Sequence, residues 1–70
     1  MLMSPTTVAD MSFLADVLAK SGHYRGWAEI ELELQDRGYP RAEHWLLNPW
    51  LRQRLSSICD LARARLETVT

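Results

Sequence analysis

The fold depends on residues 27–37, which read WAEIELELQDR. Within them Ile30, Leu32 and Leu34 alternate with polar residues, a period that is typical of a half-buried strand. A helix is favoured instead, because Glu, Leu, Ala and Gln are good helix formers and Trp27, Ile30 and Leu34 also fall at helical spacing. A lone strand would lack a partner, so we predict a helix over this segment.

Prolines and glycines mark where the helices begin and end. Pro5 suits a first helical position and Gly22 suits a left-handed C-cap, so a helix is predicted between them. Gly38 is placed to stop the next helix. Asn48 is a strong N-cap and Pro49 suits the position after it, which predicts a long final helix. The predicted helices cover about residues 5–20, 27–37, 40–47 and 49–67.

Apolar spacing predicts which helix faces enter the core. In the first helix, which starts at about Pro5 or Val8, the stripe is Val8, Met11, Leu14 or Ala15, and Leu18, widened by Phe13 and Val17. In the last helix it is Leu51, Leu55, Ile58, Ala62 and Leu66. Asp16 and Lys20 lie one turn apart, so the two side chains can pair.

A chain of 70 residues is long enough to build one hydrophobic core only, so residues 1–70 are predicted to form a single domain. The predicted class is all-α, with the helices packed orthogonally or as a bundle. Apolar residues make up 47% of the chain, with three glycines and three prolines, and this composition opposes disorder. The one cysteine, Cys59, excludes an intramolecular disulfide. A homodimer would supply burial that so short a chain struggles to provide alone.

Charge and hydropathy limit the classes of partner. Eight Lys and Arg stand against nine Asp and Glu, a net charge of −1 that gives no electropositive excess for nonspecific polyanion binding. No run approaches the roughly 18–20 apolar residues that span a bilayer, and residues 1–7 do not read as a secretory signal. We expect a cytoplasmic protein without membrane contact.

The residues that could carry chemistry occur singly. Cys59, with His23 or His44 as its base, is the one candidate for nucleophilic catalysis, but it lies among apolar residues and is expected to be a buried structural residue. These three residues also lack the ligand spacing of a zinc site. The glycines are isolated rather than grouped in a phosphate cradle. The sequence therefore predicts no enzyme, no metal and no cofactor.

Aromatic and charged residues are the candidates for partner binding. Three tryptophans and two tyrosines are more than so small a core can easily enclose, and Trp50 is the one predicted to be exposed. The second helix is acidic and the last helix basic; most such residues are simply solvated, and Glu33 can pair with Arg37. The candidate contact residues are Trp50, Trp45, Trp27, Tyr39, Glu29, Glu33, Asp36, Arg52 and Arg54. We expect a protein-interaction module that acts as an inhibitor, adaptor or accessory factor.

A helix-turn-helix DNA-binding regulator, working as a dimer, is the alternative. Residues 27–38 look like the first helix and turn of that motif, with Gly38 in the turn. Leu34, however, stands where the motif usually carries a small residue. The following residues 41–47 are mainly apolar and offer few side chains that read base edges. Nucleic acid is therefore a partner that we do not favour.

Residues 21–41 carry a resemblance to a group of proteins. Tyr24, Trp27, Glu29-Ile30, Leu34 and Gly38-Tyr39-Pro40 occur in this segment. It resembles short uncharacterised bacterial helical proteins of the kind carried by phages and other mobile elements. The resemblance implies no residue roles, and it favours a protein that acts by binding, blocking or regulating another protein.

Overall fold

The computed structural model describes residues 8–69, with side chains described up to residue 67, and within these residues it contains four helices and no strand. They are α1 (Val8–Lys20), α2 (Trp27–Asp36), α3 (Ala42–Trp45) and α4 (Pro49–Val69). The predicted all-α class is confirmed, including a helix in the glutamate-leucine segment. The proposed helix entry at Pro5 lies outside the described residues.

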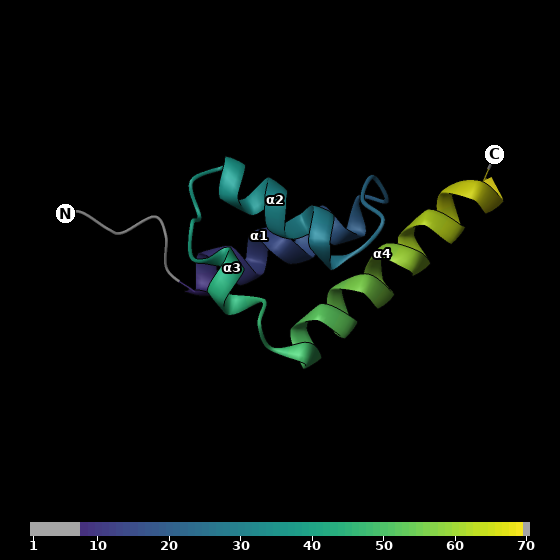
Figure 1. Cartoon of the computed structure of the whole chain (residues 1–70). Coiled ribbons are helices and arrows are strands. Elements are labelled where there is room, and N and C mark those ends of the chain that lie inside the picture. The colour runs from purple at the N-terminus through teal and green to yellow at the C-terminus, as the bar shows by residue number, and fades with distance from the viewer. Residues whose placement is uncertain (1–7, 70) are drawn as a thin grey trace.

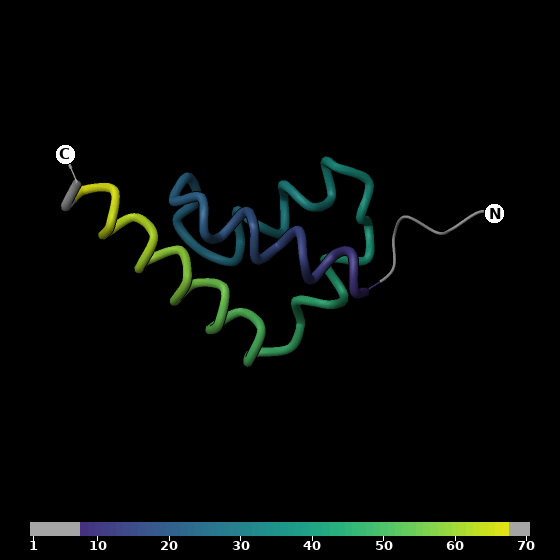
Figure 2. Tube along the Cα trace, turned by 180° about the vertical axis from the view of Figure 1, so that it is seen from behind, coloured from purple at the N-terminus to yellow at the C-terminus, as the bar shows by residue number. Residues whose placement is uncertain are grey.

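The helices α1, α2 and α4 pack against one another, and α3 joins α2 to α4 (Figure 1). α1 and α4 run in the same general direction. α2, which follows α1 in the chain, runs in the opposite direction. Figure 2 shows the fold from behind. In both views the C-terminal end of α4 extends beyond the turn that joins α1 to α2, so this end has fewer neighbours to cover it.

A stripe from each helix builds the core. The buried residues are Met11, Ala15, Leu18, Ala19, Ile30, Leu34, Ala42, Leu46, Leu55 and Cys59. Within α2 the three-and-four spacing decides which side chains enter it, because Ile30 and Leu34 are fully buried whereas Leu32 between them is 67% exposed. The period-two alternation of this segment therefore has no structural role.

The predicted caps are confirmed. Gly38 has a φ of 100° and ends α2 in a Schellman motif, in which the N–H of Tyr39 donates to the carbonyl of Leu34 at 2.9 Å. Gly22 has a φ of 80° and follows α1 in the same left-handed region. At the start of α4, Asn48 Oδ1 accepts a hydrogen bond from the N–H of Trp50 at 2.9 Å.

The third helix is shorter than the predicted residues 40–47. The N–H of Ala42 donates to the carbonyl of Tyr39 at 3.0 Å, so Pro40 lies in a turn and not in the first turn of the helix. At the other end the N–H of Leu47 donates to the carbonyl of His44 at 3.1 Å, an i→i+3 bond that closes the helix before Asn48. α3 is therefore a single turn flanked by turns.

The predicted core stripes were too wide. Val8, Phe13 and Val17 are exposed, because the side of α1 that packs inward is the narrower one through Met11 and Ala15. Leu66, which the predicted stripe of α4 also included, is 47% exposed although it lies beside Gly22 in the turn that follows α1. The apolar residues that the core does not take are thus left at the surface of α1 and α4.

Candidate interaction surface

Trp50 is the most exposed large apolar side chain among the described residues, with 80% of its surface accessible. The sequence predicted this exposure. Its backbone is fixed by the Asn48 cap, and its side chain lines a shallow surface hollow with Gln53 and Arg54, one turn further along α4. An indole held at a helix start in this way offers a large apolar surface on a rigid base.

Arg54 connects this hollow to α1. Its Nη2 donates to Asp16 Oδ2 at 2.9 Å, and this hydrogen bond to the carboxylate raises the pKa of the Arg54 guanidinium above its ordinary value. Asp16 pairs with Arg54 rather than with Lys20, because Asp16 lies on the side of α1 that faces α4 and the guanidinium reaches it across the helix interface. The Asp16–Arg54 ion pair thus joins the surface of α1 to the surface of α4.

Phe13 and Val17 flank Asp16 on α1, one turn before it and one residue after it, and both are exposed. Phe13 precedes Asp16 by three residues on α1, and Trp50 precedes Arg54 by four residues on α4, so each lies about one turn before a member of the ion pair. We call Phe13, Val17, Trp50 and Arg54 the aromatic patch.

The sequence interpretation missed the two α1 members of this patch. Phe13 and Val17 share one helix face with Asp16 and Lys20, at spacings of three, four and seven residues. That shared face was the signal that could have placed them at the surface.

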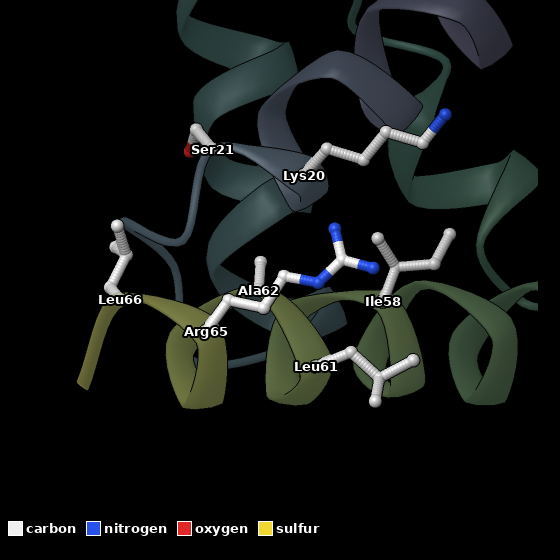
Figure 3. Close-up of a pocket in the computed structure, with 7 residues that line it drawn as sticks. All are labelled: Lys20, Ser21, Ile58, Leu61, Ala62, Arg65 and Leu66. Atoms are coloured by element: carbon white, nitrogen blue, oxygen red, sulfur yellow. The ribbon is translucent and has the colours of Figure 1, made fainter. Parts of the chain in front are cut away.

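A second concavity lies between the end of α1 and the C-terminal half of α4, with a volume of about 400 Å³. It is lined by Lys20, Ser21, Ile58, Leu61, Ala62, Arg65 and Leu66, and we call it the basic groove. Figure 3 shows the Arg65 side chain extending from α4 toward α1, with Lys20 above it on α1. Apolar side chains therefore form most of the lining, and two cations supply its charge.

Four other predicted contact residues help to hold the fold together. Trp27, Trp45 and Tyr39 are partly buried and pack against the core. Arg52 lies over the Trp27 ring, with its guanidinium carbon 4.0 Å from the ring centroid, and its Nε donates to the carbonyl of Leu46 at 2.6 Å. The structure does not bring these residues together with Trp50 on one exposed surface.

The acidic candidates lie on a separate surface, on the outward side of α2. Glu29, Leu32, Glu33 and Asp36 line it together with His23 and Tyr24, and we call the four α2 residues the acidic face. The predicted pair of Glu33 with Arg37 is present, with Oε2 and Nε 2.6 Å apart. Glu29 Oε1 accepts the backbone N–H of Arg25 at 2.8 Å. The predicted site residues are thus divided between two surfaces.

The three residues considered for catalysis lie in different surroundings. Cys59 is fully buried in the core, and burial raises the pKa of its thiol. His23 and His44 are exposed. Across residues 8–69, no group of three His, Cys, Asp or Glu side chains is placed to hold a metal ion. None of the helices in that range combines the length and apolar character needed to cross a membrane.

Comparison of the chain with protein-family models, with curated proteins and with solved structures gives no match.

Proposed function

We propose that the chain is a cytoplasmic protein-interaction module, an inhibitor, adaptor or accessory factor, which binds its partner through the aromatic patch. The observation that carries the proposal is the exposure of Trp50. Trp27 and Trp45 are packed against the core, whereas Trp50 presents 80% of its surface to solvent. An exposed tryptophan is the side chain most often found at the energetic centre of a protein interface.

The patch has the further features of a protein contact. Phe13 and Val17 are exposed apolar side chains on the helix that the Asp16–Arg54 ion pair joins to α4, and the partner would remove them from water together with the indole. The Asn48 cap orders the backbone at Trp50 and the ion pair links α1 to α4, which would lower the entropy lost on binding. We propose that Trp50 inserts into an apolar pocket of the partner protein, with Arg54 at the rim.

DNA binding is the weaker alternative. α3, which would follow the turn of a helix-turn-helix motif, has four residues. A recognition helix needs several side chains along the major groove, and one helical turn offers few of them. Arg41 and His44 are exposed there, but Glu43 between them would repel phosphate.

Site-specific photo-cross-linking in the native cell tests the proposal. A photoreactive amino acid is placed at position 50 and, as a control, at Leu47, which is also exposed but lies outside the patch. We expect a discrete protein adduct from position 50 only, and loss of co-purification of that protein with Trp50→Ala but not with Leu47→Ala. Equal adducts from both positions, or tight and strongly salt-dependent binding of duplex DNA by the purified chain, would contradict it.

A further inference from the structure

The basic groove carries charge that the fold does not use. Among the described residues, the three ion pairs engage Arg37, Arg54 and Arg63, and neither Lys20 nor Arg65 takes part in one. Asp16, the carboxylate nearest to Lys20 in sequence on the same helix face, is taken by Arg54. The groove therefore combines two uncompensated cations with an apolar lining in which Leu61 is 66% exposed.

The acidic face has the complementary pattern. Glu29, Leu32, Glu33 and Asp36 follow one another at spacings of three, one and three residues, so they share one side of α2. Leu32 is the exposed apolar side chain at the centre, with acidic groups on either side along the helix. Glu33 is neutralised by Arg37, but Glu29 and Asp36 make no ion pair within the described residues.

From this complementarity we propose that a second copy of this chain docks its acidic face into the basic groove. Leu32 of one copy would enter the apolar part of the groove, and Glu29 and Asp36 would lie near Lys20 and Arg65 of the other. The two surfaces are complementary. Each has an exposed apolar element, and the acidic face has two carboxylates without an ion pair where the basic groove has two cations without one. This contact does not involve Trp50, so it goes beyond the proposed function and stands without it.

Charge excludes one arrangement of the contact. A groove that met a second groove would bring Lys20 and Arg65 toward another pair of cations. In a two-fold symmetric dimer the groove of each copy meets the acidic face of the other, so two equivalent contacts form at once. In a head-to-tail arrangement each pair of copies forms one such contact, and the free groove and acidic face at the ends lead to a ring or a chain.

Sedimentation velocity and equilibrium on the full chain test the proposal. We expect concentration-dependent assembly at 50 mM salt, as a dimer or as larger species, and a weaker association at 500 mM salt because the charges are exposed. A chain that stays monomeric up to about 1 mM at low salt, or whose association does not weaken at high salt, overturns the proposal.

Charge reversal identifies the two surfaces. Lys20→Glu/Arg65→Glu and Glu29→Lys/Asp36→Lys should each weaken self-association by about tenfold or more, since each replaces attractive pairs with repulsive ones. Mixed together, the two variants should associate again, because the reversed groove of one meets the reversed acidic face of the other. Failure of the mixture to associate, with both variants helical by circular dichroism, overturns the proposal.

Three further variants separate the acidic face from general effects. Leu32→Ala keeps every charge but removes the central apolar contact, and it should also weaken assembly. Arg41→Glu changes a cation outside the groove and Trp50→Ala removes the aromatic patch, and both should assemble like the parent chain. Loss of assembly in Trp50→Ala would place the contact at the aromatic patch and overturn the proposal.

Discussion

The guanidinium carbon of Arg52 lies 4.0 Å from the centroid of the Trp27 ring, and the same side chain donates from Nε to the carbonyl of Leu46 at 2.6 Å. It thereby joins α4 to the start of α2 and to the residue that follows α3. Leu46 lies at the C-terminal end of α3, where carbonyl groups lack helical partners. Arg52, a predicted contact residue, therefore fixes the junction of three helices.

Arg52→Ala should lower the free energy of unfolding by about 2 kcal/mol, because it removes a cation–π contact and a hydrogen bond from a charged donor. The free energy of unfolding of Arg52→Lys should lie between those of the parent chain and Arg52→Ala. Lysine keeps the charge, but it lacks the planar group with which arginine both stacks and donates. Urea unfolding followed by circular dichroism measures both. The neighbouring Gln53→Ala is the control, with a change within about 0.5 kcal/mol. An equally small change in Arg52→Ala would show that this junction does not contribute to stability.

Asn48 fixes the start of α4 and with it the position of Trp50. Asn48→Ala should lower the free energy of unfolding by about 1 kcal/mol, because the N–H of Trp50 then loses its acceptor. Asn48→Asp should be close to the parent chain, since a carboxylate caps as well and is favoured at a helix N-terminus. Thermal unfolding curves of the three proteins give the comparison. A Tm unaffected by Asn48→Ala would argue against the cap.

The sequence predicted the bounds of α2 and α4 to within two residues because the signals there are local. Gly38, Asn48 and Pro49 act on backbone groups within a few residues of themselves, so their effects can be read without knowing the fold. The burial of Ile30 and Leu34 follows in the same way from helical spacing. The exposure of Trp50 was predicted from the limited size of the core rather than from any local pattern.

Contacts between distant parts of the chain were not predictable. Asp16 and Arg54 are 38 residues apart, and only the packing of α1 on α4 brings them together. Local spacing therefore gave Lys20 as a possible partner of Asp16, whereas the structure pairs Asp16 with Arg54. Phe13 and Val17 were assigned to the core because spacing alone cannot tell how wide a stripe the neighbouring helices cover. The basic groove was missed for the same reason, since it exists only where two helices meet.

The buried thiol of Cys59 should make stability fall at alkaline pH. Burial raises its pKa in the native chain, so above the ordinary thiol pKa of about 8.5 the unfolded chain releases a proton that the folded chain retains. The stability is fully present below that pH and is lost as pH rises toward the native pKa. We expect the unfolding free energy of the parent chain to decrease more steeply from pH 8 to 10 than that of Cys59→Ala.

The same burial should protect the thiol from reagents. A thiol-specific disulfide reagent should modify Cys59 slowly in native buffer and rapidly in urea, because the reaction needs an exposed thiolate. Rapid modification of the native chain would show that the core opens at α4 or that the thiol is reactive. A reactive, exposed Cys59 would contradict the prediction that it is a buried structural residue.

Gly22 tests the packing of the α1–α2 turn against the end of α4. A Cβ added there would lie 2.5 Å from Leu66 Cδ1 and 3.3 Å from the carbonyl oxygen of Ala62, whereas a Cβ added at Gly38 would meet nothing within 4 Å. Both glycines have positive φ, so alanine at either costs about 1–2 kcal/mol from the backbone alone. Gly22→Ala should therefore destabilise the chain more than Gly38→Ala.

The additional destabilisation of Gly22→Ala over Gly38→Ala should depend on the Leu66 side chain. A double-mutant cycle measures this dependence. In the Leu66→Ala background the two nearest obstructing atoms, Leu66 Cδ1 and Cγ, are gone, whereas the Ala62 carbonyl oxygen stays close to the new methyl group. The difference between Gly22→Ala and Gly38→Ala should then shrink by more than half, as measured by urea unfolding of the variants. If the difference is unchanged, Leu66 does not lie against the turn, and the C-terminal wall of the basic groove is not formed as the structure places it.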